Sequence, residues 1–366
     1  MEISGPYLTI NLKNLEHNLN LLRSKLKKTT EVIPVIKADG YGSNAIVITK
    51  KLISLGIKRF AVASTKEGIE LRNAGIKNPI MIFYPYIKNF KLLFENKLEP
   101  VLYSNTLINA AIKYLSDLKI TNYPVHIKFN TGLNRIGLSI NEFDLSNLTP
   151  KSKCFKILSI YSHLGASENP RPCKYTSSQI SEFEKIKKIT SEIVKPEIGF
   201  HILNTSGIFN YPEKQYDAIR SGIGLYGYAN CKDWDFELKP VLTLKAPIIQ
   251  ILKIKKGESV GYNNAWASKR NTAIAILPVG HADGITRSFG NKKIKVDING
   301  FKCPIIGNIC MDIIMIDVTN SKCKEGDFVT IFGESNSASF ISEQAGTISY
   351  ELLTGLSQRI LRKIIE

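Results

Sequence analysis

The stretch VIPVIKADGYG, Val32–Gly42, decides the fold that we expect for this chain. An apolar run rises to one lysine, Lys37, and ends in a turn that carries two glycines and a tyrosine. Such a run predicts a buried strand with an amine at its C-terminal end. The lysine either extends past the strand into water or sits in a pocket where it forms an imine with a carbonyl compound. The rest of the chain has to decide between the two.

The same rhythm of strand and helix repeats after this stretch. Helical patterns such as those from Ser43 to Gly56 and from Ser64 to Gly75 separate most of the strand-like runs. Eight runs are expected to be strands: 31–38, 59–64, 79–84, 99–104, 123–130, 155–163, 199–204 and 215–222. This count predicts a (β/α)8 TIM-type barrel over residues 13–232. An open doubly wound sheet is the competing fold, but no G-x-G-x-x-G follows the first strand.

The pattern changes beyond residue 232. Strand-rich segments with Asn-Gly and Gly-Asp turns follow, and they predict a mostly β C-terminal domain over residues 233–366, joined by residues 1–12. A final helix is expected over residues 350–365.

Composition narrows the class of protein. The net charge is +17 over 366 residues, but the lysines are spread along the chain, so we expect no nucleic-acid partner. No signal peptide and no apolar run near ~18 residues is present, which predicts no membrane partner. The six cysteines never form CxxC, which is typical of a cytoplasmic protein and indicates no metal site.

Polar residues gather at the ends of the predicted barrel strands, where active sites of such barrels lie. They bring cations, an imidazole and an amide to one rim: Lys37, Lys128, Asn130, Arg135, His163, Asn204, Thr205 and Arg220. The hydroxyl of Thr205 and the glycines of SGIGLYG, Ser221–Gly227, offer a cradle for a phosphate. A phosphate cradle facing a lone lysine suits pyridoxal 5′-phosphate (PLP), whose aldehyde forms a Schiff base with lysine.

These residues belong to motifs that resemble those of the alanine racemases, PLP-dependent enzymes built as a barrel plus a β domain. The resemblance extends from residue 37 to residue 350 and rests on nine motifs in order: VIKADGYG, KFNTGLNRIG, YSHLG, HILNTSG, IRSGIGLYG, SVGYNNAW, PVGHADGITR, GNICMDIIMIDV and ISYELL.

The resemblance implies a role for each matching residue. Lys37 would hold PLP and act as one base, and Tyr262 would be the second base, on the opposite face. Arg220 would donate to the ring nitrogen, with His163 beside it, and Arg135 and the backbone of Met311 would bind the substrate carboxylate. The phosphate would be bound by Tyr41, Thr205, Tyr350 and the backbone of Gly222 and Ile223, and Asn204 would also bind the cofactor. The enzyme would interconvert L- and D-alanine for cell-wall peptidoglycan, as a homodimer whose sites take Lys37 from one chain and Tyr262 and Met311 from the other.

Further residues carry finer expectations from the resemblance. Lys128 would lie beside Arg135 and is a candidate for carbamylation by CO₂, which would turn a like-charge pair into an opposite-charge pair. Arg287 and Asp312 would line the entrance together with His281, which stands where the family commonly has tyrosine. Asn130, Thr205 and Asn263 also depart from the commoner pattern of aspartate, serine and glycine.

Three alternatives stay open on sequence alone. They are another PLP enzyme of the same barrel type, such as a decarboxylase of basic amino acids or a broader amino-acid racemase; a PLP-binding barrel protein without turnover; and a nucleic-acid binder, which would lose affinity steeply with salt.

Overall fold

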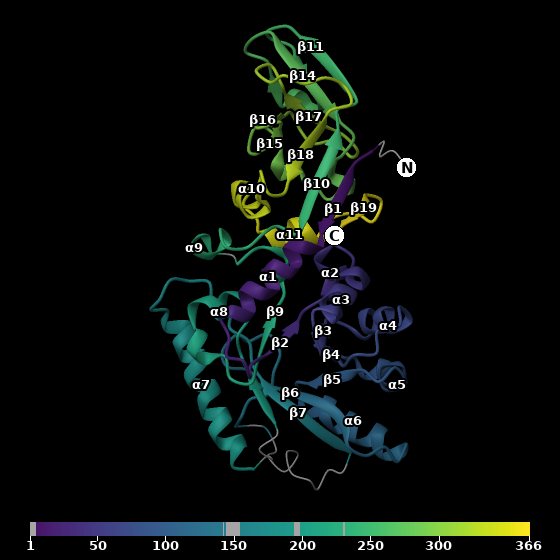
Figure 1. The fold of residues 1–366 in the computed structure, drawn as a ribbon, viewed down its shortest axis with the longest axis vertical. Helices are drawn as coiled ribbons and strands as arrows, with labels where there is room; N and C mark the ends of the chain where they lie inside the picture. The colour runs from purple at the N-terminus through teal and green to yellow at the C-terminus, as the bar shows by residue number, and fades with distance from the viewer. Residues whose placement is uncertain (1–4, 142, 144–153, 194–197, 230) are drawn as a thin grey trace.

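The computed structural model describes residues 5–141, 143, 154–193, 198–229 and 231–366. Figure 1 shows an elongated molecule with two parts, a barrel below and a β-rich unit above, and with the C-terminus at the level where the two parts meet. No helix in the described ranges combines the length and the apolar character that a bilayer crossing requires.

The barrel contains parallel strands that the sequence pattern places correctly, although each is shorter than expected. Six of them form one hydrogen-bonded sheet, and β2 pairs with β9. Two contacts close the ring: a bridge between Val35 and Ala61 joins β2 to β3, and the N–H of Arg220 donates to the carbonyl of Leu203 after β8, at 3.0 Å. The strands are β2 (Glu31–Pro34), β3 (Phe60–Val62), β4 (Ile80–Ile82), β5 (Glu99–Leu102), β6 (Tyr123–Lys128), β7 (Phe155–Tyr161), β8 (Gly199–His201) and β9 (Ala218–Ser221).

Helices follow most barrel strands and pack their apolar faces on the sheet. They are α3 (Ala45–Ser54), α4 (Thr65–Asn73), α5 (Phe90–Glu95), α6 (Asn105–Asp117), α7 (Lys174–Ser191) and α8 (Thr205–Asn210), and α1 (Leu12–Ser24) precedes the first strand. Ser64 begins α4 with a reciprocal cap to Glu67, as its sequence suggests. The cap of α3 is Asn44 rather than Ser43, because the Ser43 hydroxyl donates to the carbonyl of Gly40.

The second part is a nine-stranded sheet in the order β11-β14-β17-β16-β15-β18-β10-β1-β19. Asn299 and Gly300, both with positive φ, form the two-residue turn between β15 and β16 that the Asn-Gly pair predicts. The strands are β1 (Tyr7–Asn11), β10 (Leu242–Pro247), β11 (Gln250–Ile254), β14 (Thr272–Leu277), β15 (Lys295–Ile298), β16 (Phe301–Ile306), β17 (Ile314–Asp317), β18 (Phe328–Phe332) and β19 (Leu361–Ile365). The predicted fold class, a barrel followed by a mostly β domain, is confirmed.

The expected final helix over 350–365 is wrong. Helix α11 (Ser349–Thr354) is short, and Leu361–Ile365 forms β19, which pairs in parallel with β1 from Tyr7 to Asn11. The apolar spacing of this segment suits a helix, but β1 leaves an open strand edge beside it, and pairing with that edge satisfies the backbone of both segments.

Candidate active site

The sequence pattern placed Lys37 on the first barrel strand. In the structure it lies three residues beyond β2, at the start of the short turn α2 (Lys37–Tyr41). The next four residues, Ala38 to Tyr41, all have φ between 50° and 61°. Such a left-handed run is costly for residues with a side chain, so surrounding contacts must stabilise it. Glu67 provides one, because its carboxylate accepts from the N–H of Ala38 at 2.8 Å and from that of Ala63 at 2.7 Å.

Glu67 is a residue that the sequence analysis did not single out for the site. The signal that could have found it is the capping-box pattern of STKE, Ser64–Glu67, which the structure shows at the start of α4. The pKa of Lys37 is lowered by burial first and by Arg135 second, while the Glu67 carboxylate acts in the opposite direction. A lysine with a lowered pKa is a better nucleophile near neutral pH.

Tyr41 completes this turn and lies against the strand end of β9. It is buried, its ring stacks on Tyr226 at a centroid distance of 4.7 Å, and Tyr350 of α11 lies 5.9 Å from it. A Cβ on Gly222 would be only 2.0 Å from the Tyr41 hydroxyl oxygen. Burial, followed by the neighbouring tyrosines, raises the pKa of Tyr41 well above its usual value, so its hydroxyl remains a donor.

The loop after β9 lies beside Tyr41 and, with Thr205, forms the other half of the predicted phosphate cradle. The Thr205 hydroxyl accepts from the N–H of Gly224 at 3.2 Å and lies 3.1 Å from the Ser221 hydroxyl. Among the described residues, no backbone acceptor takes the N–H of Gly222 or of Ile223, where the turn η4 (Ile223–Tyr226) begins. Ser221 was missed by the sequence analysis, although it lies inside the IRSGIGLYG motif.

Arg220 is the centre of the polar cluster. Its side chain is buried, with the guanidinium carbon 4.6 Å above the Tyr161 ring. Its Nη2 donates to the carbonyl of Ser162 at 2.6 Å and lies 3.3 Å from Nδ1 of His163, and its Nη1 donates to Nδ1 of His201. Within the described chain its hydrogen bonds use only Nη1 and Nη2. Burial lowers the pKa of Arg220 to about 10, so it remains charged at neutral pH.

Lys128 ends β6 and lies in the same cluster. It is 5 % exposed, its amine is 5.9 Å from the Tyr161 ring centroid, and burial, then Arg135, Arg220 and Lys37, lower its pKa to about 7. Tyr161, which lies under both cations, was another residue missed from sequence. Lys128 therefore lies close enough to Arg135, Arg220 and Lys37 to be affected by their charges.

Arg135 reaches the cluster from a loop that folds back on β6. The N–H of Asn130 donates to the carbonyl of Leu138, and the N–H of Leu138 to the carbonyl of Lys128, both at 2.9 Å. The Asn130 side chain accepts from the N–H groups of Gly132 and Asn134, so asparagine supplies the turn contacts here.

His163 lies in the same cluster. Burial and the cations around it, first Arg220, hold the pKa of His163 well below its usual value.

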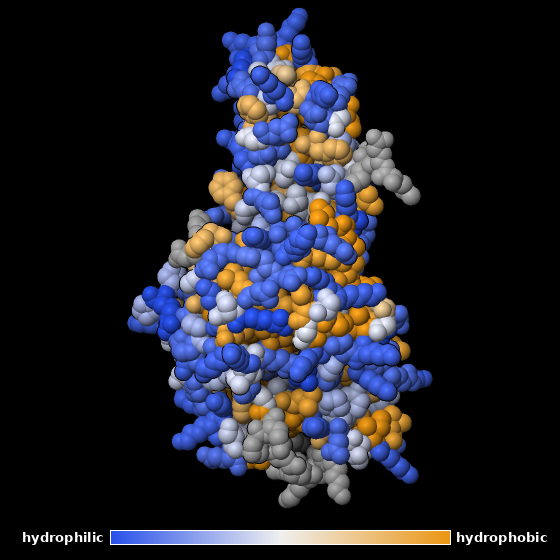
Figure 2. All heavy atoms as spheres, viewed as in Figure 1, coloured by the Kyte–Doolittle hydropathy of each residue, from blue (hydrophilic) through white to orange (hydrophobic). Residues whose placement is uncertain are grey.

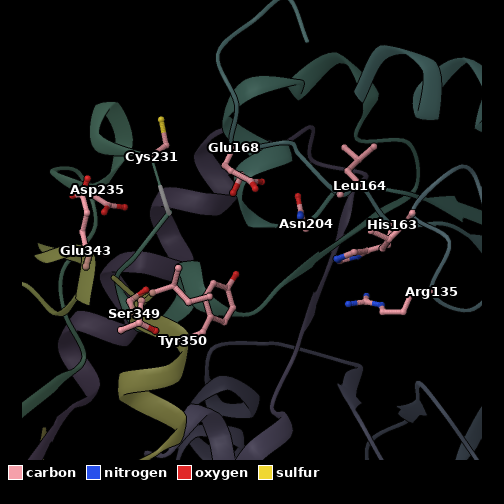
Figure 3. A pocket seen from close by; sticks show the side chains of 16 residues that line it. Arg135, His163, Leu164, Glu168, Asn204, Cys231, Asp235, Glu343, Ser349 and Tyr350 are labelled. Carbon is pink, nitrogen blue, oxygen red and sulfur yellow. The ribbon is translucent and has the colours of Figure 1, made fainter. Parts of the chain in front are cut away.

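A cavity of about 510 Å³ lies beside these groups. Figure 3 shows Arg135 and His163 directed into it from one side and Tyr350 from the other, with Asn204 between them. Asn204 also begins α8, because its side chain accepts from the N–H of Gly207 at 3.1 Å.

Tyr262 and Met311 lie elsewhere. They line a separate cavity of about 440 Å³ on the β unit, and no described residue lines both cavities. They are 68 % and 59 % exposed, which is unusual for large side chains of this type. His281 lies behind the loop of Met311, since its N–H donates to the carbonyl of Cys310 at 3.0 Å.

Asp312 and Arg287, the other predicted entrance residues, are exposed on the same unit. Asp312 accepts from Arg359 at 2.7 Å, and Arg359 also forms two bonds to the carboxylate of Asp283. Arg359 therefore ties the Met311–Asp312 loop to the PVGHADG segment, a role that the sequence analysis did not assign.

Comparison with known proteins identifies the family. The models for the alanine racemase N-terminal and C-terminal domains match residues 10–230 and 241–364. The chain belongs to the alanine racemase family. Its activity is therefore that of an alanine racemase, which is an isomerase.

Alanine racemases similar to this chain span its whole length. That of Treponema denticola is 34% identical over 98% of this chain and 97% of its own length, and that of Rickettsia canadensis is 37% identical over 97% and 98%. The Acinetobacter baumannii alanine racemase structure matches with a TM-score of 0.88 and 30% identity, covering 99% of this chain and 100% of that one. The Bartonella henselae alanine racemase with covalently bound pyridoxal phosphate matches with a TM-score of 0.89 and 28% identity, over 99% and 100% of the two chains.

Proposed function

We propose that this chain interconverts L- and D-alanine with PLP, by a two-base mechanism in a composite site of a homodimer. The observation that carries the cofactor assignment is the cradle around Gly222. The N–H groups of Gly222 and Ile223 have no protein acceptor in the described chain, and the Tyr41 and Thr205 side chains stand beside them. Hydroxyl and backbone N–H donors of this kind suit a phosphate.

The remaining residues suit the rest of the cofactor. Lys37, with its lowered pKa, would hold the aldehyde carbon, and Arg220 would use its Nε–H, which no described residue accepts, toward the ring nitrogen. Because a guanidinium can donate but not accept a hydrogen bond, the ring nitrogen facing it would have to be the acceptor and would remain unprotonated. Tyr350, Asn204 and His163 would complete the enclosure.

The chemistry requires two bases on opposite faces. Bound PLP withdraws electrons and so makes the α-hydrogen of the amino acid acidic. Lys37 would remove or return this proton on one face and Tyr262 on the other, so that each enantiomer is made from the other. Arg135 and the N–H of Met311 would hold the substrate carboxylate, which fixes the α-carbon between the two bases.

A second copy of the chain accounts for the position of Tyr262 and Met311. Both are exposed and line a cavity apart from Lys37's neighbours, so a partner chain would have to bring them to the cofactor. Figure 2 shows hydrophobic surface on one face, around the level where the barrel meets the β unit, as a partner interface would require.

We propose that the boundary between the barrel and the β domain lies between residues 232 and 233, with residues 1–12 in the β domain.

The cluster also supports carbamylation of Lys128. Addition of CO₂ needs an unprotonated amine, and a pKa of about 7 makes roughly half of the amines unprotonated at neutral pH. The carbamate nitrogen–carbon bond forms with loss of one proton, and the negative group would then pair with Arg135.

Borohydride labelling tests the assignment directly. Protein incubated with PLP should absorb in the visible, and reduction followed by peptide mass spectrometry should find the pyridoxyl group on Lys37. A racemisation assay with L- and D-alanine, and with larger amino acids for comparison, should show turnover of alanine. A label on another lysine would contradict the site, and equal turnover of larger amino acids would indicate a broader racemase.

A further inference from the structure

A line of buried polar side chains leads from Arg220 across the barrel. Nδ1 of His201 on β8 accepts from Arg220, and its Nε2 lies 2.8 Å from the Ser159 hydroxyl on β7. That hydroxyl lies 2.7 Å from Nδ1 of His126 on β6, whose Nε2 lies 3.0 Å from the Glu99 carboxylate on β5. All four side chains beyond Arg220 are at most 5 % exposed. We call Glu99, His126, Ser159 and His201 the relay.

The donors of the relay all point in one direction. A guanidinium has donors only, so Nδ1 of His201 must accept and carry no hydrogen. The hydrogen of neutral His201 is then on Nε2 and is donated to Ser159. The Ser159 hydroxyl, which already accepts, gives its own hydrogen to Nδ1 of His126. His126 then carries its hydrogen on Nε2 and donates it to Glu99.

A charged His126 paired with Glu99 is the competing arrangement. Both of its ring nitrogens would then donate, and the Ser159 hydrogen would be left without an acceptor among the described residues, which is costly in a buried position. Burial is the largest effect on the pKa of His126 and lowers it. The Glu99 carboxylate raises this pKa, and Arg59 lowers it further. Neutral His126 therefore agrees with both the hydrogen bonds and the electrostatics.

His201 has equally little freedom. Its ring stacks on Tyr161 at 4.9 Å, and burial first, then the positive charge of Arg220, with smaller effects of His126 and Arg59, hold its pKa well below the usual value. At the far end, Arg59 donates to Glu99 at 3.1 Å and fixes the carboxylate that receives the last hydrogen.

We propose that the relay positions Arg220 for the cofactor ring, by holding His201 in the one tautomer that accepts from Nη1 and leaves Nε for the ring nitrogen. The other tautomer would set an N–H of His201 against the donors of Arg220 and turn the guanidinium away. None of the relay residues lines the cavity of about 510 Å³, so they would act on the cofactor only through Arg220. The inference rests on the proposed role of Arg220.

Nitrogen-15 NMR of the histidines tests the relay on the unmodified protein, without PLP. The chain has 5 histidines, so the signals can be assigned by substituting one at a time. At pH 7, His126 and His201 should both be neutral with the hydrogen on Nε2. A doubly protonated His126, or a hydrogen on Nδ1 of His201, would overturn the proposal. Because no cofactor is present, this outcome is separate from the failure of the proposed function.

Ser159→Ala and Ser159→Thr form the matched pair for the loaded enzyme, since only threonine keeps the hydroxyl. The alanine variant should show mixed His201 tautomers and a shifted absorbance maximum of bound PLP. Its kcat should fall roughly tenfold while KM stays within about twofold, as expected for loss of one buried hydrogen bond. The threonine variant should restore the single His201 tautomer, the absorbance maximum of bound PLP and kcat. Equal behaviour of the two variants, or an unchanged His201 signal in the alanine variant, would reject the relay.

Discussion

The hydroxyl of Tyr41 occupies the space that a side chain on residue 222 would need, since a Cβ on Gly222 would lie 2.0 Å from its oxygen. This close approach joins the turn after β2 to the loop after β9, although Tyr41 and Gly222 are 181 residues apart in sequence, and makes one donor cradle from both. Glycine is required here by the contact with the Tyr41 hydroxyl, which leaves no room for a Cβ.

Gly222→Ala should weaken PLP binding by about tenfold or more. The added methyl group must displace the Tyr41 hydroxyl, and a hydrogen bond to a charged phosphate contributes ~1.5–3 kcal/mol. Affinity is measured by titrating the apoprotein with PLP and following absorbance. Gly199→Ala is the control, because a Cβ there meets its nearest atom at an ordinary 3.6 Å. Equal affinity of the two variants would contradict the cradle.

Lys128→Met should raise stability near neutral pH in CO₂-free buffer. The folded protein holds this pKa at about 7, below the 10.5 of a free lysine, so between these values the unfolded chain binds a proton that the folded chain lacks. The native lysine therefore lowers the free energy of unfolding by its full amount below pH 7, and this loss of stability disappears as the pH rises toward 10.5. At ~1.4 kcal/mol per pKa unit, the gain is of the order of a few kcal/mol at pH 6.

Denaturant unfolding of the parent and the variant from pH 6 to pH 10.5 measures this difference, which should shrink steadily. Bicarbonate should then stabilise the parent and leave Lys128→Met unchanged if the carbamate forms. A difference that stays constant with pH would show that the Lys128 amine is not the cause.

Tyr262→Phe should remove proton transfer on one face and leave PLP bound. In deuterium oxide, exchange at the α-carbon should then persist for the enantiomer that Lys37 deprotonates and be lost for the other, because phenylalanine has no exchangeable group. Mass spectrometry of each recovered enantiomer reports the exchange. Equal and modest losses for both enantiomers would mean that Tyr262 is not a base.

Mixed dimers test the composite site. Lys37→Ala and Tyr262→Phe should each be nearly inactive, but unfolding them together and refolding the mixture should restore roughly a quarter of the parent activity. With random pairing about half the dimers are mixed, and each of these has one intact site of two. Each variant refolded alone is the control. Activity that stays at the level of the two variants would place both residues in the same chain's site.

The sequence alone was sufficient for the features that depend on neighbouring residues. The alternation of strands and helices, the Asn299-Gly300 turn and the cap of α4 all follow from patterns that a few consecutive residues carry. The cations at the strand ends could also be foreseen, because parallel strands of a barrel bring their C-terminal ends to one rim.

Only the tertiary structure decided features that join distant residues. The segment Leu361–Ile365 has the spacing of a helix but becomes a strand because β1, more than 350 residues earlier, leaves an edge to pair with. The relay residues His126, Ser159 and His201 look like ordinary strand residues until three strands align them. Local spacing specifies which face a side chain takes, whereas its partner, its burial and its proton are set by whichever part of the chain packs against it.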